Sequence, residues 1–332
     1  MKIAVMGAGS WGTTVAKVIA DGGNEVLLWS RRDELATEIN ESSRNGDYLP
    51  GIDLPRSLKA TSSLEHALEG AAQVYIAIPS QTLRETLVGW KSHIPKDATV
   101  ISLMKGLEQE SGARMSEVIH QATGLPMNQI AVLSGPNLAL EIARQDPAAA
   151  VCASEDTDRA AEVARTCSND YFTVFASQDI IGTELGGVLK NLIAVAIGIV
   201  SGLGYGQNTK ASIMTRGLTE ITNFAIKHGA RRRTMFGLAG LGDLIATSES
   251  NLSRNFRAGE MLGKGYSKPE VLRRMHQTAE GLSSVRPVLE IAGRLDIDMP
   301  IVTQVSDVLE GRMSPKDFGK QLNLADAIEM EY

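Results

Sequence analysis

The sequence predicts an α/β N-terminal doubly wound domain followed by an all-α C-terminal domain. Up to Ser177, short apolar runs of strand type alternate with helical stretches. This alternation is typical of a parallel sheet whose strands are joined by helical crossovers. After Ser177 the pattern changes to long helical segments broken by glycine-rich turns, without a convincing strand. A chain of 332 residues is long enough for two domains, and we expect them over residues 1–177 and 178–332.

An N-terminal glycine motif predicts what the first domain binds. The apolar run Ile3–Met6 is followed by Gly7, Gly9 and Gly12, which fit the pattern G-x-G-x-x-G, and a helical stretch covers residues 13–20. In this order, Gly7 permits a tight turn, Gly9 leaves room for phosphates and Gly12 lets the helix pack close to the strand. The exposed N–H groups and positive end of the helix then face an anion. The motif favours a Rossmann-like dinucleotide site over a glycine-rich turn in another α/β protein.

The remaining elements of the first domain follow from the same periodicity. Short apolar runs bounded by polar or turn residues predict six further strands: Glu25–Trp29, Val74–Ile78, Thr99–Leu103, Ile130–Ser134, Ala149–Ala153 and Phe172–Phe175. Longer amphipathic stretches between them predict helices, for example over Ser80–Trp90, Arg114–Ala122 and Asp156–Cys167.

The end of the second strand bears on which dinucleotide is bound. NAD-specific domains place an Asp or Glu there, which accepts a hydrogen bond from the adenosine ribose. This chain instead has Arg31 and Arg32 directly after Leu28–Ser30. Guanidinium groups bind a 2′-phosphate in forked geometry, whereas a carboxylate would repel it. We therefore favour NADP(H). The alternative is that the arginines begin a solvated helix and that either NADP(H) or NAD(H) is accepted.

A buried lysine is the most informative feature of the second domain. The stretch Glu184–Gly198 has the length of a helix and is apolar nearly all round, so we expect it to be buried. Lys190 lies within it. Burial would disfavour the charged ammonium and suit this lysine to proton transfer. The alternative is a lysine that extends out of the core to water. Glu184 lies six residues earlier and on a different face, so it need not be the partner of Lys190.

Further polar residues gather at turns and strand ends. Lys105, Gly135 and Asn137 follow two of the predicted strands at their carboxyl ends, where doubly wound sheets bind ligands. Asp243 lies in a glycine-flanked turn, and Ser253, Arg254 and Asn255 offer three polar groups that could bind a phosphate at a helix start. The alternatives are that Asp243 and Ser253 are ordinary helix caps. The two-domain plan predicts a site in the cleft between the halves.

Composition narrows the class of protein. A net charge of −6 gives no reason to expect nucleic acid or an anionic membrane as a partner. Two cysteines are too few for a disulfide framework, and the histidines lack the spacing of a metal site, so we expect no metal and a cytoplasmic setting. The apolar start is too short for a signal peptide, and the apolar run Leu192–Val200 is too short to insert in a membrane. The sequence leaves the oligomeric state open, a homodimer included.

Taken together, the motifs resemble bacterial NAD(P)-dependent glycerol-3-phosphate dehydrogenase. The resemblance spans nearly the whole chain, and the segment around Lys190 is far more specific than the glycine motif. The matching pieces are GAGSWG at 7–12, LWSRR at 28–32, YLPGI at 48–52, IPS at 78–80, SLMKGLE at 102–108, LSGPN at 133–137, ELGGVLKNLIAVAIGI at 184–199, GLAGLGDL at 237–244, SRNFRAG at 253–259 and AEG at 279–281.

The resemblance implies roles for individual residues. Lys190 resembles the family's proton acceptor, and the resemblance implies that Asp243 orients Lys190 or a hydroxyl. Residues that resemble the cofactor contacts are Ser10, Trp11, Arg31, Arg32, Tyr48, Lys105, Ala139, Arg254 and Glu280. Residues that resemble the substrate contacts are Lys105, Gly135, Asn137, Lys190, Asp243, Ser253, Arg254 and Asn255. The chain departs from the family at Asn137, where Ser or Thr is usual, and at Thr278, where an apolar residue is usual.

The resemblance implies reversible reduction of dihydroxyacetone phosphate to sn-glycerol 3-phosphate, which supplies the glycerophospholipid backbone. Two other functions remain alternatives. A β-hydroxyacid dehydrogenase or ketopantoate-type reductase also joins a dinucleotide domain to a helical domain and uses a lysine, but acts on carboxylates. A non-catalytic NADP(H) sensor would need the glycine motif but not a buried lysine beside a polar cluster.

Overall fold

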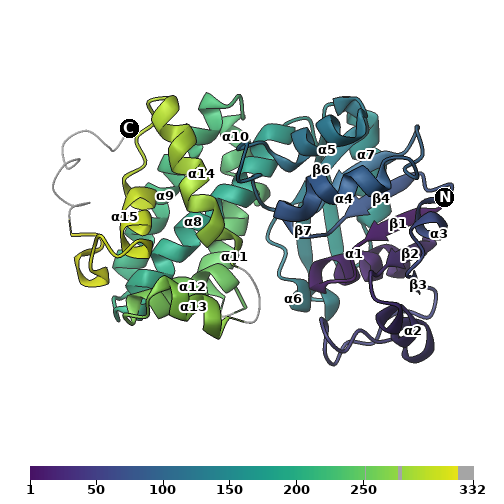
Figure 1. The fold of residues 1–332 in the computed structure, drawn as a ribbon, viewed down its shortest axis with the longest axis horizontal. Helices are drawn as coiled ribbons and strands as arrows, with labels where there is room; N and C mark the ends of the chain where they lie inside the picture. The colour runs from purple at the N-terminus through teal and green to yellow at the C-terminus, as the bar shows by residue number, and fades with distance from the viewer. Residues whose placement is uncertain (251, 276–278, 321–332) are drawn as a thin grey trace. The chain divides into compact units, whose positions relative to one another are not determined.

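The computed structural model describes residues 1–250, 252–275 and 279–320. The chain divides into two compact units (Figure 1). Unit 1 comprises Met1–Glu108 and Ala113–Glu184, and unit 2 comprises Gln109–Gly112 and the chain from Leu185 onward. Unit 1 contains a sheet with helices, and among the described residues after Ser177 there is no strand. The α/β domain followed by a helical domain is thus confirmed.

Unit 1 is built on an eight-stranded sheet in the order β3-β2-β1-β4-β5-β6-β7-β8. The strands are β1 Ile3–Met6, β2 Val26–Trp29, β3 Lys59–Thr61, β4 Gln73–Ile76, β5 Thr99–Ser102, β6 Ile130–Ser134, β7 Ala148–Ser154 and β8 Phe172–Ser177. All seven predicted strands are present. The additional strand, β3, has three residues and pairs with β2 at the edge of the sheet, and it is too short to show a periodic pattern.

The last two strands, β7 and β8, run against the expected direction. The pairing of β6 with β7 is antiparallel, whereas the other neighbouring strands are parallel. The only regular element between them is the five-residue helix α6 (Ala139–Ala143). Five helical residues rise about 7.5 Å, which is about half the length of the five-residue strand β6. Because this helix cannot return the chain to the start of the sheet, β7 begins at the end where β6 stops.

Two apolar layers hold the sheet of unit 1 between its helices. Alternate residues of β1 point to opposite faces, so Ile3 and Val5 join one buried cluster while Ala4 and Met6 join the other. Besides α6, the helices of unit 1 are α1 Ser10–Asp21, α2 Asp33–Ser42, α3 Leu64–Leu68, α4 Leu83–Trp90, α5 Met115–Thr123 and α7 Thr157–Cys167. The first cluster takes residues from α1, α2, α6 and α7, and the second from α3, α4 and α5.

Unit 2 is helical and is organised around α8. This helix begins at Ile180 in unit 1 and ends at Gly202. The others are α9 Gln207–Lys227, α10 Arg232–Met235, α11 Asp243–Glu249, α12 Arg254–Gly263, α13 Lys268–Arg274, α14 Glu280–Arg294 and α15 Pro300–Leu309 (Figure 1). The predicted glycine turn before Asp243 is instead a π-helical turn, η3, over Leu238–Gly242.

Glycines let the backbones of α8 and α12 touch. A Cβ atom at Gly198 would lie 2.2 Å from the carbonyl oxygen of Phe256, and one at Gly259 would lie 2.1 Å from the carbonyl oxygen of Val195. No side chain fits at such distances, so any substitution at either position would push the helices apart. This close approach holds the helix that carries Lys190 directly against the helix that begins at Arg254.

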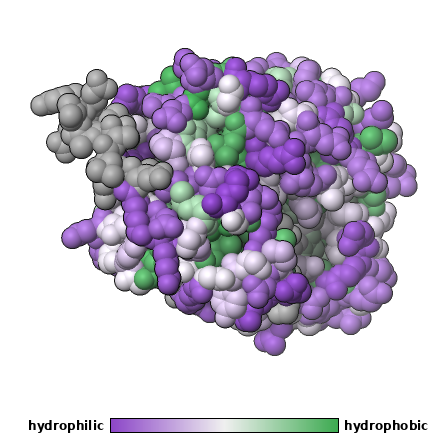
Figure 2. Space-filling view, turned by 60° about the vertical axis from the view of Figure 1, so that its left-hand side comes forward, coloured by the Kyte–Doolittle hydropathy of each residue, from purple (hydrophilic) through white to green (hydrophobic). Residues whose placement is uncertain are grey.

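Helix α8 is long and apolar enough to cross a membrane by length and composition, with a mean hydropathy of 1.7. The run Leu192–Val200 alone was expected to be too short to cross a membrane. The whole helix is longer, because it extends beyond this run at both ends. However, 89% of its apolar window is buried inside the protein, as expected for a core helix. On the face shown in Figure 2, hydrophilic residues predominate and apolar residues form small separate areas.

A buried carboxylate from α9 caps another helix of unit 2. The two oxygens of Glu220 accept hydrogen bonds from the backbone N–H groups of Ile301 and Val302, at 2.9 and 3.0 Å, in the first turn of α15. Burial nevertheless raises the pKa of Glu220 from its ordinary value of 4.5 to about 7. The two N–H groups and the positive end of the helix oppose this rise, and Asp298 adds to it.

Glu220 should therefore make stability depend on pH. Because this carboxyl binds its proton more tightly in the folded than in the unfolded chain, its contribution to stability is greatest below pH 4.5 and is lost as pH rises through about 7. Relative to Glu220→Gln, the wild type should lose about 3 kcal/mol of unfolding free energy across this range. Urea unfolding at several pH values measures the difference. Glu41→Gln, at an exposed position of α2, is the control, and an equal pH dependence in wild type and Glu220→Gln would contradict the prediction.

Candidate functional site

The glycine motif forms a tight cradle at the start of α1. Gly7 has φ +125°, and a Cβ there would lie 2.4 Å from the carbonyl oxygen of Ala77. A Cβ at Gly12 would lie 2.0 Å from the carbonyl oxygen of Gly7. A Cβ at Gly9, in contrast, would have no atom within 4 Å. Two glycines are thus required by packing, and the third leaves open space at the helix N-terminus, where a pyrophosphate is attracted by the N–H groups from Ser10 onward.

Buried polar atoms without partners lie beside this cradle and beyond β6. The indole N–H of Trp11 and both polar atoms of the Asn137 amide are buried and have no hydrogen-bond partner among the described residues. Such atoms cost about 1–3 kcal/mol each when they stay unpaired. Ala139, at the start of α6, is tied to α1 because its carbonyl accepts a hydrogen bond from Thr14 Oγ1 at 3.2 Å. These features fit a polar ligand that supplies the missing partners, as a nicotinamide dinucleotide and its substrate would.

Two predicted residues meet at the carboxyl ends of neighbouring strands. Lys105 follows β5 and Gly135 follows β6, and the Lys105 Nζ donates a hydrogen bond to the Gly135 carbonyl at 2.9 Å. Gly135 has φ +150°, and a Cβ there would lie 2.9 Å from Ala150 Cα. The structure therefore places an ammonium group at the ligand-binding edge of the sheet and fixes it to the backbone.

The tip of β2 is followed by the two arginines, and the loop that contains Asp47 and Tyr48 contacts one of them. Arg31 is exposed and forms no hydrogen bond or ion pair with any described residue. Arg32 Nη2 lies 2.6 Å from Asp47 Oδ2, and its guanidinium lies 5.7 Å from the centre of the Tyr48 ring. The hydrogen bond to Asp47 raises the pKa of Arg32. Tyr48, which the resemblance implies as a cofactor contact, thus lies beside Arg32, and Asp47 was not among the predicted residues.

In unit 2 the buried lysine has a carboxylate partner. Lys190 Nζ lies 2.9 Å from Asp243 Oδ1, with the two side chains 6% and 2% exposed. Lys190 also donates a hydrogen bond to Thr247 Oγ1, and Thr247 Oγ1 donates to Asp243 Oδ1 at 3.1 Å. Lys190 does not extend to water, and the carboxylate favours its charged form against the effect of burial. Asp243 is the first residue of α11 rather than its N-cap, which is Gly242.

Thr247 was missed although the sequence contains a signal for it. It lies four residues after Asp243, so the two share one face of α11. The signal was hidden because the glycine-rich segment before Asp243 was interpreted as a turn. A helix starting there would have brought Thr247 into the predicted polar cluster.

A second polar network joins three helices of unit 2. The Asn255 Nδ2 donates to Asn191 Oδ1 at 2.8 Å, and Asn255 Oδ1 accepts from the Gly281 N–H at 2.9 Å. Ser253 is the N-cap of α12 and accepts a hydrogen bond from Phe256 N at 3.2 Å. The alternative that Ser253 is a helix cap is therefore confirmed. Arg254, the first residue of α12, is exposed.

The predicted site residues are divided between the two units. Unit 1 holds the glycine motif, Ser10, Trp11, Arg31, Arg32, Tyr48, Lys105, Gly135, Asn137 and Ala139. Unit 2 holds Lys190, Asp243, Ser253, Arg254, Asn255 and Glu280. Thr278 lies outside the described residues. Among the described residues, no group of three or more His, Cys, Asp or Glu side chains could hold a metal ion.

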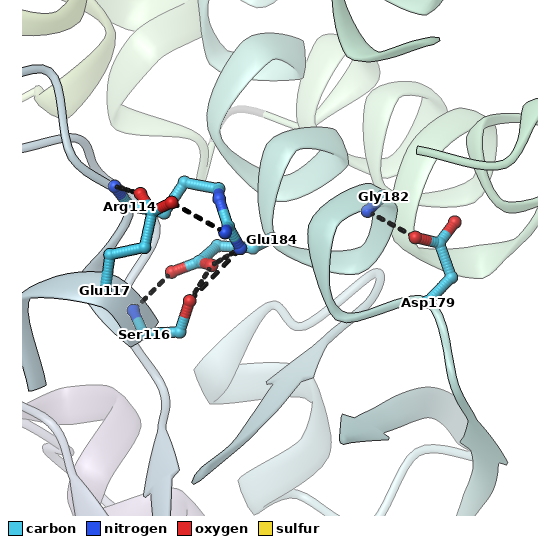
Figure 3. Close-up of polar contacts among 6 residues, drawn as sticks. All are labelled: Arg114, Ser116, Glu117, Asp179, Gly182 and Glu184. Carbon is cyan, nitrogen blue, oxygen red and sulfur yellow. Dashed lines mark hydrogen bonds and ion pairs between the residues drawn. The ribbon is translucent and has the colours of Figure 1, made fainter. Parts of the chain in front are cut away.

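A buried ion pair fixes the first turns of α8 (Figure 3). Glu184 accepts hydrogen bonds from Ser116 N at 2.9 Å and Ser116 Oγ at 2.6 Å, and pairs with Arg114 Nη1 at 3.0 Å. Asp179 Oδ1 accepts from Gly182 N at 2.8 Å and so caps the helix. Burial raises the pKa of Glu184, and Arg114 and the Ser116 donors oppose the rise. As expected, Glu184 has partners of its own and is not paired with Lys190.

The two units offer three chemical capacities between them. The cradle of unit 1 can bind a pyrophosphate. The buried ammonium of Lys190, oriented by a carboxylate and a hydroxyl, can give or take a proton at a substrate oxygen. Arg254 and the N-terminus of α12 can attract an anion.

Comparison with known proteins agrees with this combination. A family model described as the NAD-dependent glycerol-3-phosphate dehydrogenase N-terminus matches residues 2–160, and one for the C-terminus matches residues 179–320. Over 322 residues the chain is 58% identical to the glycerol-3-phosphate dehydrogenase (NAD(P)+) of Leifsonia xyli, covering 97% of this chain and 87% of that protein.

Solved structures give the same result. The glycerol-3-phosphate dehydrogenase of Coxiella burnetii is similar with a TM-score of 0.90 and 36% identity, covering 97% of this chain and 98% of that one. A ketopantoate reductase from Ralstonia eutropha is similar with a TM-score of 0.58 and 17% identity, covering 94% of this chain and 99% of that one. At that identity the likeness shows the fold alone.

The Glu184 ion pair should contribute strongly to stability. Glu184→Ala leaves a largely buried guanidinium without one partner and two donors of Ser116 unpaired, so we expect a loss of about 3 kcal/mol in unfolding free energy. Glu117→Ala is the matched control, because the 40% exposed Glu117 carboxylate contacts the same guanidinium at 2.9 Å. Loss of this contact should lower the unfolding free energy by about 1 kcal/mol. Denaturant unfolding measures both, and equal losses would contradict the special role of the buried pair.

Proposed function

The chain belongs to the NAD-dependent glycerol-3-phosphate dehydrogenase family, and we propose that it catalyses the reversible reduction of dihydroxyacetone phosphate to sn-glycerol 3-phosphate. The observation that carries this proposal is the buried Lys190–Asp243–Thr247 group, in a chain that also has a dinucleotide cradle. Residues 1–177 act as the nucleotide-binding domain and residues 178–332 as the catalytic domain. The enzyme works in the cytoplasm, where its product serves glycerophospholipid synthesis.

The cofactor, NAD(H) or NADP(H), supplies or accepts the hydride when bound. Gly7, Gly9, Gly12 and the N–H groups of Ser10 and Trp11 hold its pyrophosphate, because the cradle is open only at Gly9. Arg31 and Arg32 face the adenosine ribose from the tip of β2. Their guanidinium groups favour a 2′-phosphate, so NADP(H) is preferred and NAD(H) is also accepted. Tyr48, Lys105, Ala139, Arg254 and Glu280 complete the cofactor contacts.

Lys190 is the acid in the direction of reduction and the base in the direction of oxidation. When a hydride reaches the ketone carbon, the oxygen needs a proton, and Lys190 gives it as an ammonium. Asp243 and Thr247 hold the Nζ in one orientation, so that no rearrangement is needed at the moment of transfer. Lys105, fixed by the Gly135 carbonyl, adds a second positive group that polarises the carbonyl.

The phosphate of the substrate is bound by Ser253, Arg254 and Asn255. Arg254 is exposed at the start of α12, where the helix dipole also attracts an anion. Asn255 is held by Asn191 and Gly281, so it is already positioned before substrate arrives. Asn137 uses its unpaired amide for a further substrate contact. An assay of NADPH and NADH oxidation with dihydroxyacetone phosphate tests the activity, with 2-keto acids as substrates that should not react.

Loss of the Lys190 ammonium should abolish most turnover. We expect Lys190→Ala to lower kcat by at least about 10²-fold, because positioned acid–base groups contribute roughly this much. The control is Lys264→Ala, which removes an exposed lysine paired with Glu260 in the same unit and should leave kcat unchanged. Steady-state kinetics with saturating cofactor measure both, and near-normal kcat in Lys190→Ala would refute the assignment.

Loss of Arg254 should act mainly on binding of the phosphorylated substrate. We expect Arg254→Gln to raise KM for dihydroxyacetone phosphate about tenfold or more, because hydrogen bonds to charged groups are the stronger ones. Arg257→Gln removes another exposed arginine of α12, one turn further on, and should not change KM. If both variants raise KM equally, general attraction rather than a specific contact is responsible.

A further inference from the structure

The adenosine end of the nucleotide site contains a carboxylate that the strand itself does not supply. Asp47 forms an ion pair with Arg32, with 2.6 Å between Oδ2 and Nη2. Both side chains are about half exposed, at 57% and 46%. Arg31, next to Arg32, is exposed and forms no such pair with a described residue. One of the two arginines is thus paired with a carboxylate.

The loop that carries Asp47 is attached to the nucleotide cradle. Asn45 is fully buried, and its Nδ2 donates to the Ala8 carbonyl at 3.0 Å and to Thr13 Oγ1 at 2.8 Å. Its Oδ1 accepts from Tyr48 N at 3.3 Å. Asn45 therefore ties residues 45–48 to the glycine turn and the first turns of α1. This attachment places Asp47 at the nucleotide site of unit 1 rather than on a free surface loop.

We propose that Asp47 is a specificity-determining residue that weakens discrimination in favour of a 2′-phosphorylated cofactor. This inference rests on the proposed function, in which Arg31 and Arg32 face the adenosine ribose. A 2′-phosphate that binds Arg32 has to displace the Asp47 carboxylate and then remain near it, and like charges repel. A ribose 2′-hydroxyl meets no such repulsion, because it can donate a hydrogen bond to a carboxylate. Asp47 thus takes, from a loop, the role that a carboxylate at the strand tip has in NAD-specific domains.

The test compares two ligands that differ only in the 2′-phosphate. Binding of adenosine 2′,5′-bisphosphate and of 5′-AMP is measured by calorimetry at low salt for the wild type and Asp47→Asn. The bisphosphate should bind about fivefold more tightly to Asp47→Asn, the size expected for an exposed ion pair, while AMP binding changes little or weakens. The ratio of kcat/KM for NADPH to that for NADH should rise by a similar factor.

The control is Asp53→Asn, because Asp53 pairs with Arg44 at 2.9 Å in another exposed ion pair of the same loop region. This variant removes the same charge and should leave the ligand ratio unchanged. In an Arg32→Gln background, Asp47→Asn should lose most of its effect, since the two residues act as a pair. The difference in bisphosphate affinity between the wild type and Asp47→Asn should also shrink at high salt.

Three results would overturn the inference. Equal effects of Asp47→Asn and Asp53→Asn would show that only overall charge matters. Weaker bisphosphate binding in Asp47→Asn would show that Asp47 orients Arg32 for the phosphate rather than competing with it. Failure of both ligands to bind the wild type would remove the nucleotide site, and with it the proposed function as well.

Discussion

The pairing of Lys190 with Asp243 is the interaction on which the catalytic unit depends. An ammonium and a carboxylate taken out of water each lose several kcal/mol of solvation, and only close pairing and added hydrogen bonds offset this loss. Here the two charges lie 2.9 Å apart, and the Thr247 hydroxyl bonds to both. The geometry has to be held firmly, because moving the two groups even slightly apart would leave two uncompensated buried charges. The surrounding apolar helix and its glycine contacts provide that rigidity.

Close backbone contact at glycine is how this rigidity is achieved in both units. In unit 2, Gly198 and Gly259 bring α8 against α12, and α12 carries Asn255, which is bonded to Asn191 on α8. In unit 1, Gly12 packs on the Gly7 carbonyl, which aims the N-terminus of α1. The same device therefore fixes the helix that carries Lys190 in one unit and the glycine cradle in the other. Neither arrangement tolerates a methyl group at the contact.

Features with a local signature could be predicted from the sequence, and features set by distant contacts could not. The strands, the glycine cradle and the burial of Lys190 follow from short patterns of apolar residues and glycine. The strand β3 and the reversed direction of β7 do not, because one is very short and the other depends on how far a five-residue helix can reach. Burial alone suggested a neutral amine at position 190. The family resemblance implied that Asp243 orients Lys190 or a hydroxyl, but no local pattern distinguishes these roles, because tertiary packing sets the contact.

The ion pair of unit 2 and the ion pair of unit 1 differ in a way that matches the roles proposed for them. Lys190–Asp243 is buried, so separating the charges is costly and the pair can serve as a fixed catalytic device. Arg32–Asp47 is half exposed, so water and salt screen the two charges and the pair is weak. A pair that weak can yield to an incoming phosphate, and its strength sets how much preference the arginines can express. In the proposed function, proton transfer therefore depends on the buried Lys190–Asp243 pair, and the proposed control of cofactor choice depends on the exposed Arg32–Asp47 pair.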